Sequence, residues 1–121
     1  MELVLGVATN DSEAGARAHM KGLGVADRFQ LILGSDSGFG GKPEPGMQIA
    51  FSEVTGVPLA ECLMVGDSLH DLHSGRAAGM ICVAVLTGPA PRSELEPHAD
   101  VVLPDISHLP EWIKQQLKSD V

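Results

Sequence analysis

The sequence is poor in aromatic residues and in positive charge. It has no tyrosine, one tryptophan and three phenylalanines, and its 8 basic residues are outnumbered by 16 acidic ones, for a net charge of −8. The pI is about 4.9. Because lysines and arginines are scattered singly in an acidic chain, the composition argues against partners such as nucleic acid or an anionic membrane.

Long apolar runs are also missing. No segment approaches the roughly 18 apolar residues of a membrane-spanning helix, and residues 1–3 do not resemble the start of a signal peptide. Cysteine is rare: Cys62 and Cys82 each lie inside an apolar stretch. This setting predicts buried, reduced thiols rather than a disulfide or a metal site. Together these absences predict a cytoplasmic protein.

What is present is a pattern of short apolar runs that alternate with helical segments. The 121 residues, 44% of them hydrophobic, suffice for one domain and not for two, so we expect a single domain over residues 1–121. Strands are expected at residues 3–8, 29–33, 63–65, 81–86 and 100–103. Helices are expected between residues 12 and 23, 45 and 56, 68 and 79, and 109 and 117. The alternation predicts an α/β fold: a three-layer α/β/α, Rossmann-like arrangement around a parallel sheet.

Two apolar patterns make more detailed predictions. Residues 3–8 are apolar on both parities, as in a strand that is covered on both faces. In the second helix, Met47, Ala50, Phe51 and Val54 fall at i, i+3, i+4 and i+7, which predicts one buried stripe.

Polar residues collect where the expected strands end. Thr9 and Asn10 follow the first strand, Asp67 follows the third with Asp71 one helical turn later, and Lys42 lies in a glycine-rich loop. In an open parallel sheet, ligands bind at the carboxyl ends of the strands. This rim would suit a phosphate held against Mg²⁺, because it combines a hydroxyl, an amide, a fixed cation and two carboxylates. Lys42 would neutralise the phosphate oxygens, and the carboxylates are the hard oxygen ligands that Mg²⁺ prefers.

Each of these features also has a plain structural interpretation. A Thr-Asn pair after a strand often caps a helix, a lysine in a glycine loop is often solvated, and Gly-Asp-Ser is a common turn and cap. Their coincidence on one rim favours the phosphate site.

These same residues resemble motifs of the haloacid dehalogenase (HAD) superfamily. The segments are Leu5–Asn10, Gly41–Pro45 and Val65–Asp71, the last continuing through Gly75–Met80, and they are similar to the family's second, third and fourth motifs. The likeness is to phosphoglycolate-phosphatase-like and beta-phosphoglucomutase-like members, and it covers about residues 3–105.

The resemblance implies a role for each residue. Thr9 would hydrogen-bond the transferring phosphoryl group with Asn10 beside it, and Lys42 would stabilise negative charge on the nucleophile and the phosphate. Asp67 would bind Mg²⁺, and Asp71 would support the metal's water shell or Lys42. The implied activity is that of a Mg²⁺-dependent phosphatase of a small phosphorylated metabolite.

One departure from the family is large. Its members begin with a strand that ends in Asp-x-Asp, whose first aspartate is the nucleophile, and a helical cap follows. Here the Thr9 strand begins at residue 3. The strand that ends in Asp-x-Asp and the cap are therefore absent from this chain. Asp11 lies at a helix start and Asp36 in a loop, and neither ends an apolar strand in an Asp-x-Asp pattern.

The absent strand would lie between the strands that end at Thr9 and Asp67. Losing it removes on the order of five to ten backbone hydrogen bonds, each worth about 1 kcal/mol net. We therefore expect the flanking strands to pair directly, or elements to be exchanged with a second copy, or the chain to be part of a longer protein. Exposed strand edges favour a homo-oligomer.

Three functions compete. The first is the core of a HAD-type phosphatase that is inactive or incomplete alone. The second is a phospho-receiver of the response-regulator type, although receivers place their acidic pair before the threonine and lysine, and here the order is Thr9, Lys42, Asp67. The third is a non-catalytic remnant that binds Mg²⁺, phosphate or a partner and self-associates.

Two further features are expected to be structural. His70 and His73 stand at i, i+3 beside Asp71, a spacing that suits a metal, but no other histidine or cysteine converges on them, so a solvated or supporting role is favoured. Trp112 is expected to pack the terminal helix onto the sheet.

Overall fold

The computed structural model describes residues 3–119 and confirms an α/β fold with parallel strands. The strands are β1 (Gly6–Ala8), β2 (Leu31–Leu33), β3 (Leu63–Gly66), β4 (Ile81–Val85) and β5 (Val101–Leu103). The helices are α1 (Glu13–Gly22), α2 (Gly46–Thr55), α3 (Leu69–Ala78), α4 (Arg92–Leu95) and α5 (Leu109–Ser119). Within the described residues, no helix has both the length and the apolar character needed to cross a membrane.

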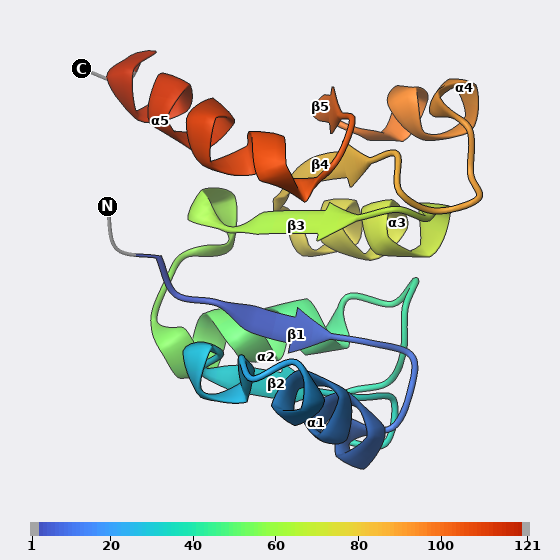
Figure 1. Ribbon diagram of the computed structural model, residues 1–121, viewed down its shortest axis with the longest axis vertical. Coiled ribbons are helices and arrows are strands. Elements are labelled where there is room, and N and C mark those ends of the chain that lie inside the picture. The colour runs from blue at the N-terminus through green and yellow to red at the C-terminus, as the bar shows by residue number, and fades with distance from the viewer. Residues whose placement is uncertain (1–2, 120–121) are drawn as a thin grey trace.

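The strands form two sheets, not the single sheet expected. β1 pairs with β2, and β3, β4 and β5 pair in that order, all in parallel. β1 and β3 point the same way and face each other across the middle of the molecule (Figure 1). Direct pairing of these two strands, one of the three expected outcomes, does not occur within residues 3–119.

The three-stranded half holds the most deeply buried core. Leu72, Cys82, Val83, Ala84 and Leu95 have no exposed surface. β4 is paired on both edges, and α3 packs against both β3 and β4. Leu95 belongs to the short helix α4, which the sequence patterns did not predict. α3 ends at Gly79, whose φ of 87° is the left-handed conformation that glycine adopts without strain.

The two-stranded half is less completely covered. Ile32 and Leu33 of β2 are buried. The segment before β1 is not covered on both faces as expected: Leu3, Val4 and Leu5 are 52%, 44% and 41% exposed. The paired part of this strand begins only at Gly6.

The predicted stripe on α2 is only partly correct. Met47 and Ala50 are buried and Phe51 is half-buried, but Val54 is 58% exposed. A helix of ten residues is about 15 Å long, whereas a three-residue strand spans about 10 Å. The last turn of α2 therefore extends past the strands that would bury Val54.

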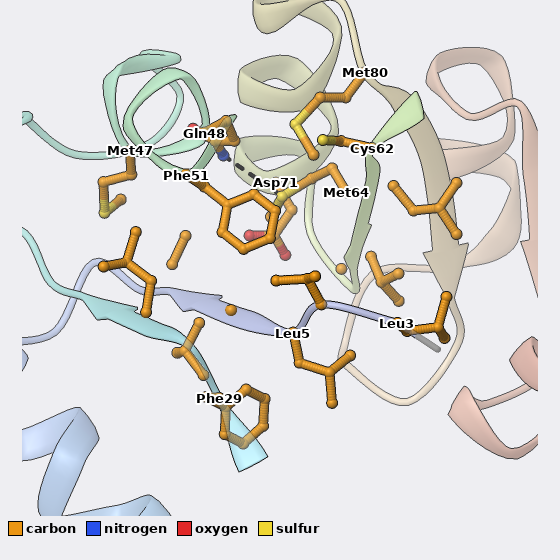
Figure 2. A pocket seen from close by; sticks show the side chains of 18 of the residues that line it. Leu3, Leu5, Phe29, Met47, Gln48, Phe51, Cys62, Met64, Asp71 and Met80 are labelled. Atoms are coloured by element: carbon orange, nitrogen blue, oxygen red, sulfur yellow. Dashed lines mark hydrogen bonds between the residues drawn. The ribbon is translucent and has the colours of Figure 1, made fainter. Parts of the chain in front are cut away.

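A cavity of about 770 Å³ separates the two halves. We call it the slot. Its walls include β1 and its preceding segment, β3, α2 and the start of α5, with Leu5, Phe51, Met64 and Ile113 among its apolar lining residues. Figure 2 shows Leu5, Phe51 and Met64 around this space. The slot therefore lies where the HAD resemblance places the absent strand.

Candidate functional site at the rim of the slot

The polar residues predicted from the sequence meet at the carboxyl ends of β1 and β3. Thr9 and Asn10 follow β1, Asp67 follows β3, and Asp71 lies in the first turns of α3. Lys42 lies in the loop between β2 and α2. Lys42, Asp67 and Asp71 also line the slot, so the site and the slot are continuous.

Lys42 and Asp71 form a nearly buried ion pair. Lys42 Nζ contacts Asp71 Oδ1, and the two side chains are 11% and 10% exposed. The other carboxylate oxygen, Asp71 Oδ2, accepts hydrogen bonds from the Asp67 backbone N–H at 3.1 Å and from Ser68 Oγ at 3.2 Å. Asp71 is thus fully engaged in holding Lys42 and the turn after β3, and of its two expected roles the contacts match the support of Lys42.

The turn after β3 requires a glycine. A Cβ on Gly66 would lie 2.2 Å from Asp71 Oδ2, far inside contact distance. Ser68 caps α3, because its Oγ accepts a hydrogen bond from the Asp71 backbone N–H at 3.4 Å. The Gly-Asp-Ser turn therefore serves as a cap, as its plain interpretation predicts, and also brings the Asp71 carboxylate to Lys42.

Asn10 holds the backbone of Lys42 rather than pointing into open space. Its Oδ1 accepts a hydrogen bond from the Lys42 N–H at 2.7 Å, and its Nδ2 donates to the Lys42 carbonyl at 3.1 Å. A Cβ on Gly41 would lie 3.1 Å from Asn10 Oδ1, so the loop passes close to the amide. The Lys42–Pro43 peptide bond is cis. Asn10 and Asp71 thus fix Lys42 at its backbone and at its tip.

Thr9 retains a free hydroxyl proton. Its Oγ1 accepts a hydrogen bond from the Asp11 backbone N–H at 3.1 Å, which matches the capping interpretation. Within residues 3–119 its hydroxyl has no acceptor, and the residue is half-buried. The side chain can therefore donate to an anion at the rim while it caps the turn.

The Asp67 carboxylate is available at the rim. Its carboxylate is half-buried and accepts no hydrogen bond from the residues described, although a Cβ on Gly88 would lie only 2.6 Å from its Oδ2. No group of three histidine, cysteine or acidic side chains converges in the described part of the chain. Asp67 thus fits a hard cation as one oxygen ligand, and further ligands would have to come from elsewhere.

Comparison with known proteins agrees with this geometry. A family model described as HAD-hydrolase-like matches residues 39–109, which include Lys42, Asp67 and Asp71. The chain belongs to the HAD-hydrolase-like family.

Curated members of this family share much of the sequence. The phosphoglycolate phosphatase of Rhodospirillum rubrum is 36% identical over 109 residues, covering 90% of this chain and 45% of that protein. The phosphoglycolate phosphatase of Neisseria meningitidis is 41% identical over 109 residues, covering 88% and 46%. The crystal structure of a candidate phosphoglycolate phosphatase from Lactobacillus delbrueckii subsp. bulgaricus matches with a TM-score of 0.82 at 31% identity, covering 91% of this chain and 46% of that one.

These matches define what part of the family fold this chain represents. It spans slightly less than half the length of the curated relatives it matches and corresponds to their C-terminal portion. The HAD-like recognition from the three motifs is therefore confirmed, and so is the fold class.

The cysteines of this HAD-hydrolase-like chain are structural, as expected. Cys62 and Cys82 are free and 4% and 0% exposed. Burial raises the pKa of both thiols above the ordinary value, so neither favours the reactive thiolate.

The histidines form no metal-ligand group with the rim carboxylates among the described residues. His70 and His73 are exposed, and the ring of His73 meets that of His98 edge-on at 4.9 Å. Trp112 is half-buried on α5, beside the buried Ile113.

Sequence patterns missed a buried polar pair beneath the HAD-type rim. Gln48 of α2 is 2% exposed and Ser74 of α3 is fully buried, and Gln48 Nε2 donates to Ser74 Oγ at 2.7 Å. A signal was available, because Gln48 shares a helix face with Phe51 at i, i+3 and Ser74 shares one with Asp71. Polar residues on faces that are otherwise inward predict buried hydrogen bonds.

Proposed function

We propose that this chain is the core portion of a Mg²⁺-dependent HAD-type phosphatase acting on a small phosphorylated metabolite, and that it needs an Asp-bearing strand in the slot for turnover. The observation that carries the proposal is the position of Lys42. It is held at backbone and tip, beside the slot and at the same rim as Thr9 and Asp67.

The rim supplies groups that suit a phosphate monoester. The Lys42 ammonium would neutralise charge on the phosphate oxygens, and the Thr9 hydroxyl would donate a hydrogen bond to one of them. Asn10 and Asp71 would act as positioning residues, because they fix Lys42 before the substrate binds. Hydrolysis converts the monoester and water to an alcohol and inorganic phosphate.

Magnesium fits this rim through Asp67. Its carboxylate is the acidic group at the rim that makes no hydrogen bond within residues 3–119, and it would be the ligand that this chain provides. A bound Mg²⁺ would supply charge neutralisation for the phosphate oxygens. The remaining ligands would be water, substrate and the carboxylates of the strand in the slot.

The printed names of the relatives suggest a substrate. Both curated relatives are named phosphoglycolate phosphatases, which makes phosphoglycolate the first metabolite to assay. The match to these proteins covers less than half of their length, so the substrate is part of the proposal.

Complementation with a peptide tests the proposal. The chain, Mg²⁺ and p-nitrophenyl phosphate or phosphoglycolate are assayed alone and with a synthetic strand peptide of alternating valine and alanine that ends in Asp-Val-Asp. We expect little turnover alone and measurable turnover with the peptide. Turnover should be lost when the first aspartate of the peptide is replaced by asparagine, since that aspartate is the proposed nucleophile.

Substitutions of rim residues test whether the complemented turnover depends on the rim. Lys42→Ala should abolish the complemented turnover, and Thr9→Val should reduce it at least tenfold. Lys21→Ala, which removes an exposed lysine on α1, is the matched control and should leave it unchanged. Substantial Lys42-dependent turnover by the chain alone would show that it contains its own nucleophile. A peptide that binds without restoring turnover would favour the non-catalytic remnant.

A further inference from the structure

Gly88 lies against the side chain of Asp67 and leaves no room for a side chain of its own. A Cβ at this position would lie 2.6 Å from Asp67 Oδ2, 2.8 Å from its Cγ and 3.0 Å from its Cβ. Gly88 is not one of the glycines with positive φ, so no left-handed turn calls for glycine here. What position 88 requires is therefore space for the Asp67 carboxylate.

The contact with Gly88 is what restrains Asp67. Asp71, the other carboxylate of the rim, is oriented by Lys42 Nζ, by Ser68 Oγ and by the Asp67 backbone N–H. The Asp67 carboxylate, in contrast, accepts no hydrogen bond from the residues described, and it is half-buried. Packing against the backbone of Gly88 thus limits the rotamers that Asp67 can adopt.

The loop that carries Gly88, residues 86–91, is held at both ends. The Leu86 N–H donates to two backbone carbonyls at the end of β5 and just after it, each at 3.2 Å, and Leu95 of the following helix α4 is fully buried. Pro89 and Pro91 restrict the backbone between them. Figure 1 shows this loop passing the turn that leads from β3 into α3. A side chain at position 88 would therefore displace Asp67 more readily than the loop.

We propose that Gly88 is a positioning residue for the metal, and that its lack of a side chain keeps the Asp67 carboxylate in the rotamer that binds Mg²⁺. This step rests on the proposed function, in which Asp67 is the metal ligand that this chain provides. Turning the carboxylate about χ2 would not relieve a Cβ at position 88, because Cγ itself lies too close, so the carboxylate would swing away about χ1. Mg²⁺ demands near-ideal octahedral geometry, and a displaced ligand weakens its binding.

Titration of the chain alone with Mn²⁺ tests this role without turnover and without the peptide. Mn²⁺ takes carboxylate and water ligands as Mg²⁺ does, and it broadens the NMR signals of nuclei close to it. In the unmodified chain, Mn²⁺ should broaden the backbone amide signals of residues 67, 68 and 88 first. In Gly88→Ala, we expect the same broadening to require at least about fivefold more Mn²⁺.

Two control variants belong to this titration. Gly22→Ala adds the same methyl group at an exposed glycine of α1 where a Cβ meets nothing within 4 Å, and it should leave the Mn²⁺ dependence unchanged. Asp67→Asn should lose the broadening at the rim, and adding Gly88→Ala to it should cause no further loss, because Gly88 acts through Asp67.

The rotamer of Asp67 gives a second measurement, made without metal. Couplings between the Asp67 Hα and Hβ protons should report a single χ1 in the unmodified chain and a different or averaged χ1 in Gly88→Ala. Urea unfolding without metal should give similar midpoints for the two chains, which separates displacement of Asp67 from general damage to the fold.

An averaged χ1 in the unmodified chain, no broadening at the rim, or equal Mn²⁺ dependence in Gly88→Ala would overturn the inference. If Gly88→Ala does not fold, the χ1 of the unmodified chain decides: a single rotamer supports the role of Gly88 and an averaged one removes it. Complemented turnover with the same Mg²⁺ dependence in both chains would leave the proposed function standing without this role. Mn²⁺ binding that depends on Gly88, without complemented turnover, would do the reverse.

Discussion

β1 and β4 are both apolar strands of parallel sheets, yet they differ sharply in burial. Cys82, Val83 and Ala84 of β4 have no exposed surface, whereas Leu5 beside β1 is 41% exposed. β4 has a strand on each edge and α3 across one face, while β1 has a partner on one edge and the slot on the other. The comparison teaches that burial of an apolar strand depends on its neighbours and not on its own composition.

The two halves also differ in what stabilises them. The three-stranded half relies on apolar packing around Leu72 and Leu95. The two-stranded half adds polar contacts between α1 and the loop after β2: Ser37 Oγ donates to Glu13 Oε1 at 2.8 Å, and the Glu13 N–H donates to Asp36 Oδ1 at 2.8 Å. The three-stranded half should therefore respond more strongly to loss of apolar volume, and the contacts of Glu13 should make the packing of α1 sensitive to pH.

Polar contacts join the halves beside the slot. Lys42 belongs to the two-stranded half and Asp71 to the three-stranded half, and the same holds for Gln48 and Ser74. The rim that we propose for phosphate is thus also a connection between the halves, and substitutions there should affect both stability and function.

The largest expected effect is that of breaking the Lys42–Asp71 pair. Asp71→Asn leaves a nearly buried ammonium without its counter-charge, and we expect a loss of about 3–5 kcal/mol in the free energy of unfolding. Lys42→Met combined with Asp71→Asn should lose less than the sum of the single changes, because no lone charge remains. Urea unfolding followed by circular dichroism measures all three variants. Single losses below about 1 kcal/mol would mean that water already compensates the pair.

The next largest effect is expected from removing apolar volume, and the loss of stability should differ between the two halves. Leu72 is fully buried against Cys82 and Leu95, so Leu72→Ala should cost about 2–5 kcal/mol. Leu5→Ala removes the same atoms from an exposed position at the slot and should cost about 0.5 kcal/mol or less. The midpoints of urea unfolding measure both losses of stability. Similar losses for the two variants would contradict the difference in burial between the two halves. With the strand peptide bound, the cost of Leu5→Ala should rise, because the peptide would cover Leu5.

Local sequence patterns account for most of the individual elements. The alternation of apolar runs and helical segments located all five strands, and left-handed glycines at positions 56 and 79 end α2 and α3 as the sequence predicts. The rim residues were placed correctly relative to the strand ends because that position follows from parallel topology alone.

What the sequence could not predict depends on missing or distant neighbours. The exposure of Leu3–Leu5 and the division into two sheets follow from what lies beside β1, which its own residues do not encode. The double contact of Asn10 with Lys42 joins residues 32 positions apart through a glycine loop, for which no periodicity exists. α4 was missed because four residues are too few to show a helical repeat.

A smaller effect is expected from loosening Lys42 at its backbone. Asn10→Ala removes two exposed hydrogen bonds to Lys42 and should lower the free energy of unfolding by about 1 kcal/mol. Asn10→Asp keeps the acceptor for the Lys42 N–H but sets a carboxylate oxygen against the Lys42 carbonyl, so its loss should be at least as large as that of Asn10→Ala. Urea unfolding compares the two variants, and a smaller loss for Asn10→Asp would show that the acceptor bond at 2.7 Å outweighs this repulsion.

The smallest expected effect is a pH dependence in the two-stranded half. Hydrogen bonds from Ser37 and Arg17 hold the pKa of Glu13 below its ordinary value of 4.5. A carboxyl whose pKa is lower in the folded state stabilises the fold above the unfolded pKa, and this stabilisation is lost as the pH falls through the folded value. The urea midpoint of the unmodified chain should therefore exceed that of Glu13→Gln at pH 7, and the difference should shrink below about pH 4.5. Glu53→Gln, at an exposed position on α2 without a side-chain hydrogen bond in the described residues, is the control. A Glu13→Gln difference that is constant between pH 7 and pH 3 would show that the carboxylate charge has no part in joining α1 to the loop after β2.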